Sequence, residues 1–147
     1  MTFAAASPAG LDIVVSTMAS DAHTWNLVFL QMFLEERGHR VTNLGACVPD
    51  DRLVEHCRQA APDLIVLSSV NGHGTLDGLR VVPQLRARPE LSDTPMVIGG
   101  KLGITEEDDV LAGRSLRAAG FDEVFTGPDS IERFTAYLAR WSTVVPA

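Results

Sequence analysis

Short apolar runs alternate along the chain with longer segments whose apolar residues recur at helical spacing. The runs lie at residues 11–16, 41–44, 63–69, 95–99 and 121–125. They are short, and most are rich in β-branched or aromatic residues, which predicts β-strands. The run at 63–69 is the most continuous of them and has a proline before it and a glycine after it. This pattern predicts a strand buried on both faces.

Five helices are predicted between and after these strands. They lie at residues 25–37, 49–61, 75–86, 105–119 and 130–141. Gly38 and Gly120 are natural stops after the first and fourth helices, and the sequence from Thr105 to Asp108 predicts a capping box at the start of the fourth. Pro83 is expected to kink the third helix or end it early. His39, directly after the Gly38 stop, is predicted to be a solvated turn residue.

The regular alternation of strand and helix predicts an α/β fold with parallel strands, because crossovers of this length connect parallel neighbours by right-handed connections. The expected architecture is a doubly wound five-stranded sheet of Rossmann-like or flavodoxin-like type. A chain of 147 residues fits one such domain. We assign the domain to residues 11–141, with flexible tails at 1–10 and 142–147.

Composition excludes several classes of function. There are 12 Lys and Arg against 19 Asp and Glu, which gives a net charge of −7. Such a chain is not expected to bind nucleic acid or an anionic membrane surface, and no apolar run approaches the length of a membrane span. The two cysteines, Cys47 and Cys57, form neither a disulfide framework nor a zinc ribbon and fit a reducing cytoplasm. We predict that Cys57 is a core residue.

Ligands bind such sheets at the carboxyl ends of the strands, so the loops that follow the strands carry the candidate chemistry. The loop after the first strand has no phosphate-binding glycine motif. It places Asp21 and His23 two residues apart. An imidazole can ligate a metal through one nitrogen while a carboxylate holds the other. The alternative is a solvated histidine beside an acid that caps the next helix.

The loops after the third and fourth strands carry small residues. Ser68 and Ser69 end the third strand, the loop at residues 71–74 follows, and Gly99 and Gly100 end the fourth. Serines can hydrogen-bond a ligand, and glycines let a large planar group approach the backbone. Strand ends without bulky side chains indicate a wide, flat ligand, although ordinary turns would have a similar composition.

Taken in order, the segments Ser20-Asp-Ala-His23, Ser68-Ser-Val70 and Gly99-Gly100 resemble the signature of cobalamin-binding domains, which is D-x-H-x-x-G, S-x-L and G-G. The chain is most similar to the small-subunit family of glutamate mutase (methylaspartate mutase), over roughly residues 11–140. Phe121-Asp-Glu-Val-Phe125 also resembles the last strand of that family.

The resemblance implies a role for each part of the signature. His23 would be the lower axial ligand of cobalt, Asp21 would orient His23, and the nucleotide tail would pass between the first helix and the sheet beside Ser68. The implied cofactor is adenosylcobalamin, and the implied activity is that of an isomerase subunit. The implied cofactor-binding residues are Ser20, Asp21, Ala22, His23, Thr24, Ser68, Ser69, Val70, Gly72, Gly74, Gly99 and Gly100.

The resemblance also implies a partner, a larger barrel-type mutase subunit that binds most of a small amino acid substrate. The chain departs from the signature at Asn26, which stands in place of its last glycine beside Trp25. Both side chains add bulk where the nucleotide tail would enter. Two other functions remain open: a corrinoid carrier for methyl transfer, and a non-enzymatic flavodoxin-like binding domain that has lost cobalamin.

Overall fold

The computed structural model describes residues 10–21, 23–69, 74–102 and 105–141. Its strands are β1 (Asp12–Ser16), β2 (Arg40–Asn43), β3 (Leu64–Ser69), β4 (Met96–Gly100) and β5 (Glu123–Phe125). They form one parallel sheet in the order β2-β1-β3-β4-β5, which confirms the predicted fold class. The order reverses direction between β1 and β3, and this switch point is where doubly wound sheets bind ligands.

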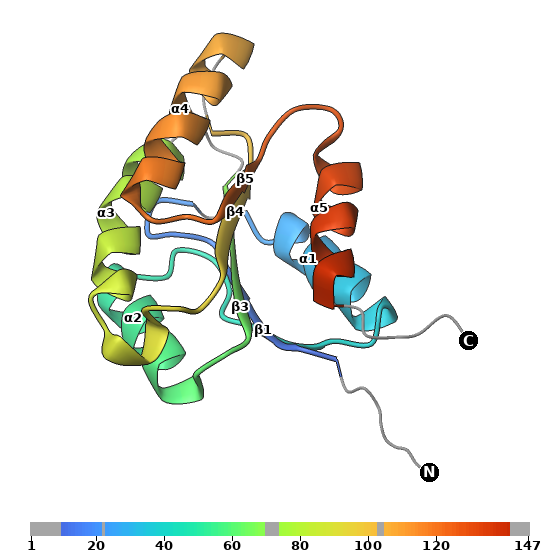
Figure 1. Cartoon of the computed structure of the whole chain (residues 1–147), viewed down its shortest axis with the longest axis vertical. Helices are drawn as coiled ribbons and strands as arrows, with labels where there is room; N and C mark the ends of the chain where they lie inside the picture. The colour runs from blue at the N-terminus through green and yellow to red at the C-terminus, as the bar shows by residue number, and fades with distance from the viewer. Residues whose placement is uncertain (1–9, 22, 70–73, 103–104, 142–147) are drawn as a thin grey trace.

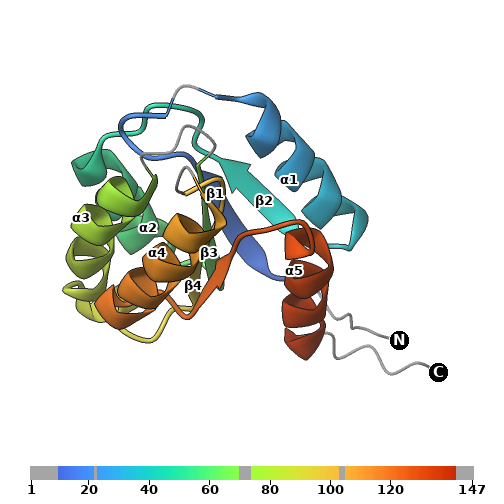
Figure 2. The same cartoon turned by 90° about the horizontal axis from the view of Figure 1, so that it is seen from above.

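Helices cover both faces of the sheet. The helices are α1 (Trp25–Glu36), α2 (Asp50–Ala60), α3 (Gly74–Arg86), α4 (Glu106–Ala119) and α5 (Ser130–Leu138), with short 3₁₀ turns η2 (Pro89–Leu91) and η3 (Ala139–Trp141). Helices α1 and α5 pack on one face, while α2, α3 and α4 pack on the other (Figures 1 and 2). The result is a three-layer α/β/α arrangement.

The core is divided by the sheet into two apolar clusters. Ile13 and Val15 of β1 belong to the cluster under α1 and α5. Val14, between them, belongs to the cluster under α2, α3 and α4, because successive side chains of a strand point to opposite faces. All six residues of β3 are buried, as the sequence predicts for a strand covered on both sides.

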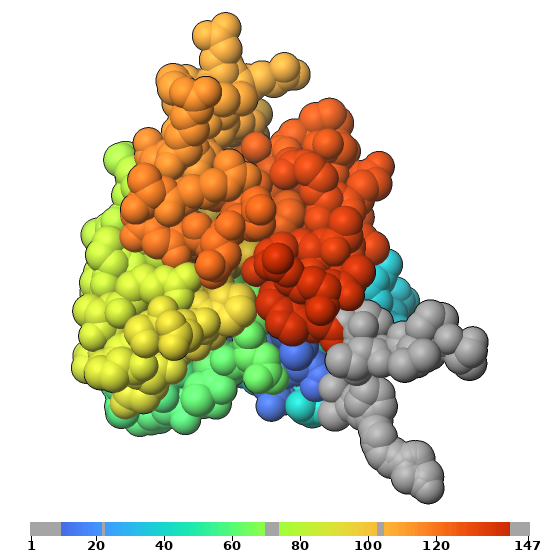
Figure 3. Space-filling view, in the orientation of Figure 1, coloured from blue at the N-terminus to red at the C-terminus, as the bar shows by residue number. Residues whose placement is uncertain are grey.

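Helix α4 begins with the predicted capping box. The backbone N–H of Asp108 donates to Thr105 Oγ1 at 3.1 Å, and the backbone N–H of Thr105 donates to Asp108 Oδ2 at 3.2 Å. These bonds satisfy two donors that the first turn would otherwise leave unpaired. The first turns of α4 project beyond the rest of the molecule at the upper end of Figure 3.

The third helix reaches its predicted end, so of the two effects expected of Pro83 the early end does not occur. Helix α3 continues past Pro83 to Arg86. Pro83 lies on the exposed side, where the carbonyl that loses its N–H partner can face water. On the opposite side Val81, Val82 and Leu85 are fully buried, and this packing stabilises the helix despite the missing bond.

The prediction for His39 is wrong. Its imidazole is half-buried, and Nδ1 accepts a hydrogen bond of 3.0 Å from the backbone N–H of Leu11. Burial, with smaller contributions from Arg37 and Arg40, lowers the pKa of His39, so the neutral ring that accepts this bond is favoured. His39 therefore anchors the chain just before β1. Within the described ranges, none of the helices has the length and apolar character that crossing a bilayer would demand.

Candidate functional site

The candidate loops meet at the carboxyl edge of the sheet. Strands β1, β3 and β4 are neighbours, and the register pairs Ser68 with Gly99 and Ser69 with Gly100. The loop from β1 to α1 leaves the sheet beside them. The three parts of the sequence signature, separated by up to 79 positions from Asp21 to Gly100, therefore lie on adjacent strand ends.

Asp21 and His23 form a pair in which one partner is buried and the other exposed. The imidazole Nδ1 of His23 lies 2.9 Å from Asp21 Oδ1, and the exposed fractions of the two side chains are 59% and 1%. The backbone N–H of His23 donates to the same oxygen at 2.9 Å. Because a neutral ring that donates from Nδ1 leaves Nε2 as its acceptor, the pair presents Nε2 as the nitrogen able to bind a metal.

The loop that carries this pair is held by the backbone of its neighbours. Thr17 Oγ1 donates to the carbonyl of Asp21 at 2.9 Å, and the backbone N–H of Cys47 donates to the same carbonyl at 2.8 Å. The backbone N–H of Asp21 donates to the carbonyl of Met18 at 3.0 Å. The position of the Asp21 carboxylate is thus fixed by contacts from its own loop and from the loop after β2.

The donor set suits a metal that already carries most of its ligands. Among the residues that the structure describes, no group of three or more His, Cys, Asp or Glu side chains could hold a metal ion. A single imidazole is, however, the usual protein contribution to an ion held in a tetrapyrrole macrocycle, where the ring occupies the equatorial positions. The residues present therefore fit a corrin-bound cobalt with His23 as an axial ligand.

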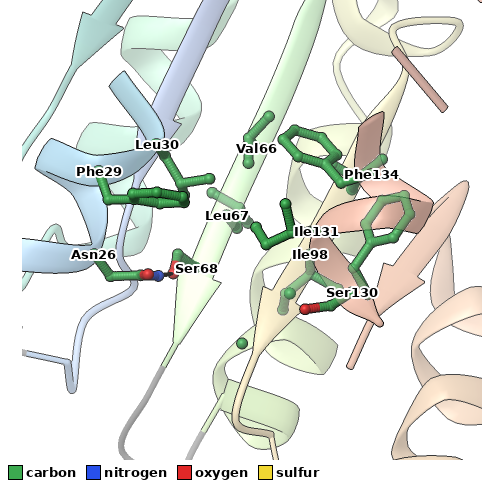
Figure 4. Close-up of a pocket in the computed structure, with 14 residues that line it drawn as sticks. Asn26, Phe29, Leu30, Val66, Leu67, Ser68, Ile98, Ser130, Ile131 and Phe134 are labelled. Carbon is green, nitrogen blue, oxygen red and sulfur yellow. Dashed lines mark hydrogen bonds between the residues drawn. The ribbon is translucent and has the colours of Figure 1, made fainter. Parts of the chain in front are cut away.

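A cavity of about 90 Å³ lies between the sheet, α1 and α5. Its walls are apolar and include the aromatic rings of Phe29, Phe125 and Phe134. Figure 4 shows Phe29 and Leu30 on one side, Ile131 and Phe134 on the other, and Asn26 and Ser68 together at one end. Such walls favour a flat, largely apolar group that enters from the carboxyl edge.

Asn26 contributes the polar end of this cavity with Ser68. The side-chain amide of Asn26 donates a hydrogen bond to Ser68 Oγ, from the first turn of α1 to the end of β3. Trp25, by contrast, is 83% exposed and does not line the cavity. Of the two bulky residues that the sequence places at this entrance, Asn26 lines the cavity and Trp25 does not.

Two glycines at the carboxyl ends of the strands are needed for the close approach of backbone segments to each other. Gly100 has a φ of +108°, and a Cβ on it would lie 2.0 Å from the carbonyl oxygen of Ser69. A Cβ on Gly74 would lie 2.5 Å from the Ser69 Cβ, since Gly74 begins α3 rather than belonging to the loop. These two glycines allow the chain to approach itself around Ser69, while Gly99 and Gly100 also line the cavity.

The remaining predicted residues are placed as follows. Ser20 is in the loop before Asp21, and Thr24 is the N-cap residue of α1, without a side-chain capping bond. Ala22, Val70 and Gly72 lie outside the described residues. Cys57 is buried, which raises its pKa to about 12 and confirms that it is a core residue.

Sequence reasoning missed the part of the cavity that comes from the end of the chain. Phe125, Ser130, Ile131 and Phe134 line it from β5 and α5. Their spacing marks them only as residues of a strand and a helix. Their contribution to the site follows from the packing of α5 beside α1, which no local pattern reveals.

The model of the B12-binding domain family matches residues 11–128 of this chain. The chain is 30% identical over 122 residues to the glutamate mutase sigma subunit of Fusobacterium nucleatum, a match that covers 82% of this chain and 88% of the relative. It is 28% identical over 128 residues to the sigma subunit of Escherichia coli O157:H7, covering 87% of this chain and 85% of that one.

A solved cobalamin-binding protein from Desulfitobacterium hafniense has the same fold. The two superpose with a TM-score of 0.69 at 23% identity, over 90% of this chain and 59% of that protein. The site and the fold define a B12-binding protein. The chain belongs to the B12-binding domain family and is a homologue of the glutamate mutase sigma subunits.

Proposed function

We propose that this chain is the cobalamin-carrying subunit of an adenosylcobalamin-dependent carbon-skeleton mutase of the glutamate mutase type. The observation that carries the proposal is the Asp21–His23 pair at the carboxyl edge, beside the cavity between α1, α5 and the sheet. The similarity to sigma subunits supports the mutase over a methyl-transfer carrier.

In this proposal His23 binds cobalt through Nε2, and Asp21 fixes the tautomer and direction of the ring through Nδ1. A buried carboxylate that accepts from Nδ1 raises the basicity of Nε2 and strengthens it as a ligand. Bound adenosylcobalamin supplies a cobalt–carbon bond whose homolysis starts radical chemistry, while the protein positions and ligates the cofactor.

The cavity is the proposed site of the nucleotide tail of the cofactor. The aromatic rings of Phe29, Phe125 and Phe134 offer flat apolar surfaces to the benzimidazole, and Ser68 and Ser130 offer hydroxyl groups. Since a cavity of about 150 Å³ is needed for benzene, this space would widen as the base enters. With the base in this cavity, its nitrogen is separated from cobalt, and His23 can occupy the position it leaves. The other proposed contacts are Ser20, Ala22, Thr24, Ser69, Val70, Gly72, Gly74, Gly99 and Gly100.

We further propose a larger, barrel-type partner subunit that binds glutamate or a related amino acid. The imidazole of His23 is 59% exposed, so a corrin bound to it would rest on the surface of this chain. Radical chemistry needs exclusion of water and of side reactions, and a second subunit would provide that cover. The free thiols fit a cytoplasmic setting.

Histidine ligation is tested by electron paramagnetic resonance of the cob(II)alamin complex. In protein labelled with ¹⁵N-histidine, the cobalt lines are expected to split into doublets, because a ¹⁵N nucleus has spin one-half. Unlabelled protein should give triplets from ¹⁴N. The His23→Ala variant should lose the dependence on the label, and the Asp21→Asn variant should bind cobalamin about 10–100-fold more weakly.

His56→Ala is the matched control, because His56 lies on α2 away from this loop. Its spectrum should equal that of the parent protein. Triplets in the labelled protein would mean that benzimidazole still binds cobalt, and the proposal would then be wrong. Absence of a red complex with hydroxocobalamin would instead favour a binding domain that has lost the cofactor.

A further inference from the structure

A buried carboxylate on α3 contacts the loop between β1 and α1, called here the histidine loop because it carries His23. Asp77, in the first turn of α3, is 6% exposed. Its Oδ2 accepts hydrogen bonds from the Ser20 hydroxyl and, at 3.3 Å, from the Ser20 backbone N–H. Its Oδ1 accepts from Arg80 Nη1 at 2.9 Å. Each carboxylate oxygen therefore has its own partner.

Arg80 extends these contacts to a third segment. Its Nε and Nη2 donate to the two carboxylate oxygens of Asp50 at 2.6 and 2.9 Å, and Gln84 also donates to Asp50. The pKa of Asp50 is held below its usual range, mainly by the hydrogen bond from Arg80. The start of α2, the first turns of α3 and the histidine loop are thus joined by one network of charged groups.

We propose that Asp77 is a positioning residue for the metal-binding imidazole, acting through Ser20. Ser20 directly precedes Asp21, whose carboxylate holds His23 by two contacts of 2.9 Å. Thr17 and Cys47 donate hydrogen bonds to the backbone carbonyl of Asp21. Asp77 accepts hydrogen bonds from the preceding residue, Ser20. This inference rests on the proposed function, since it assigns a role in cofactor binding.

This role requires both carboxylate oxygens of Asp77 to accept hydrogen bonds. An ionised carboxylate accepts on both oxygens, so it can bind Ser20 and Arg80 at the same time. In Asp77→Asn the amide –NH2 would face either Arg80 or the backbone N–H of Ser20, both of which only donate, so one of these contacts would be lost. A loop that is no longer held must be ordered when the cofactor binds, and this cost lowers affinity.

The first measurement uses the chain without cofactor. Amide hydrogen exchange of His23 reports opening of the bond between its N–H and Asp21. We expect faster exchange in Asp77→Asn and in Ser20→Ala than in the parent protein. Exchange in the double variant should be as fast as in either single variant, because the effects of two substitutions that break the same contact do not add.

The second measurement titrates hydroxocobalamin into each protein and records cob(II)alamin resonance with ¹⁵N-histidine. The Asp77→Asn variant should bind cobalamin about 10–100-fold more weakly. A smaller fraction of its bound cob(II)alamin should show the splitting that depends on the ¹⁵N label. The control is Asp122→Asn. Asp122 also accepts hydrogen bonds from Arg86, at 2.9 Å, and from the backbone N–H of Met96, at 2.8 Å. It directly precedes β5 and therefore lies at the amino ends of the strands, away from the histidine loop.

Unchanged exchange of His23 and unchanged cobalamin affinity in Asp77→Asn would overturn the inference, as would equal losses in Asp122→Asn. If Asp77→Asn fails to fold, Ser20→Ala tests the same contact and leaves the pair of Asp77 and Arg80 intact. If the parent protein shows no histidine-dependent signal while exchange responds as expected, the proposed function is wrong and the positioning contact is retained.

Discussion

At the scale of single residues, the contact between Asn26 and Ser68 has the most direct effect on the cavity. It closes the polar end of a space whose other walls are apolar. The nucleotide tail of cobalamin would have to displace the amide of Asn26 from Ser68 in order to enter. We therefore expect the departure from the sequence signature at Asn26 to weaken cobalamin binding without abolishing the site.

Replacement of Asn26 by alanine is expected to tighten cobalamin binding about fivefold. The hydrogen bond between Asn26 and Ser68 must break before the nucleotide tail enters, and a neutral hydrogen bond contributes about 1 kcal/mol net. Removal of the amide removes this cost, which corresponds to about fivefold in affinity. Absorbance titration with hydroxocobalamin measures the effect. Gln31→Ala, on the same helix but outside the cavity, should leave affinity unchanged. Weaker binding by Asn26→Ala would show that the amide contacts the cofactor instead.

At the scale of elements, the ends of β3 and β4 approach each other too closely for a side chain at residue 100. The backbone N–H of Lys101 donates to the carbonyl of Ser69 at 2.7 Å, directly beside Gly100. This tight contact brings Ser68 and Ser69 alongside the Gly99-Gly100 turn. The ends of β3 and β4 form one wall of the cavity. Their close spacing shapes this wall more than the small size of the glycine residues does by itself.

The variant Gly100→Ala is expected to lower the free energy of unfolding by about 3 kcal/mol, because its Cβ would add a clash to an unfavourable φ. Urea denaturation followed by circular dichroism measures the change. Gly38→Ala is the matched control: Gly38 has a φ of +90° and no atom within 4 Å of a Cβ built there, so it should lose only about 1–2 kcal/mol. Equal losses would contradict the role of the clash.

At the scale of the whole molecule, the site lies on one edge of the sheet and is open to a partner. The contacts described above would hold or orient a ligand, and the chain offers one exposed imidazole, that of His23, at this edge. In the proposed enzyme we therefore expect this chain to carry the cofactor and the partner to enclose the substrate.

The isolated chain is therefore expected to bind adenosylcobalamin but to show no conversion of glutamate. Addition of the barrel-type subunit should restore turnover, since the partner supplies the substrate site and excludes water. Product formation is measured by chromatography of the amino acids, with the His23→Ala chain plus partner as the control. Turnover by the purified chain with cofactor and substrate alone would contradict the proposed partnership.

The sequence by itself determined the strands, the helices and the order of the candidate loops, because hydrophobic periodicity, caps and glycine stops act over a few residues. It also placed Asp21 and His23 within reach of each other, since two positions in one short loop cannot lie far apart, while the hydrogen bond between them was seen only in the structure. The early helix end at Pro83 and the solvated ring of His39 do not occur, because burial of one helix face and a contact across 28 positions override local preference.

Only the tertiary structure decided the cavity and the support of the histidine loop. The packing of α5 beside α1 brings Phe134 to the same space as Asn26, and the packing of α3 at the carboxyl edge brings Asp77 to Ser20, 57 positions away. Contacts between segments so distant in sequence depend on which face of the sheet each helix covers. That choice is made by the burial of apolar surface over the whole fold, and no short pattern encodes it.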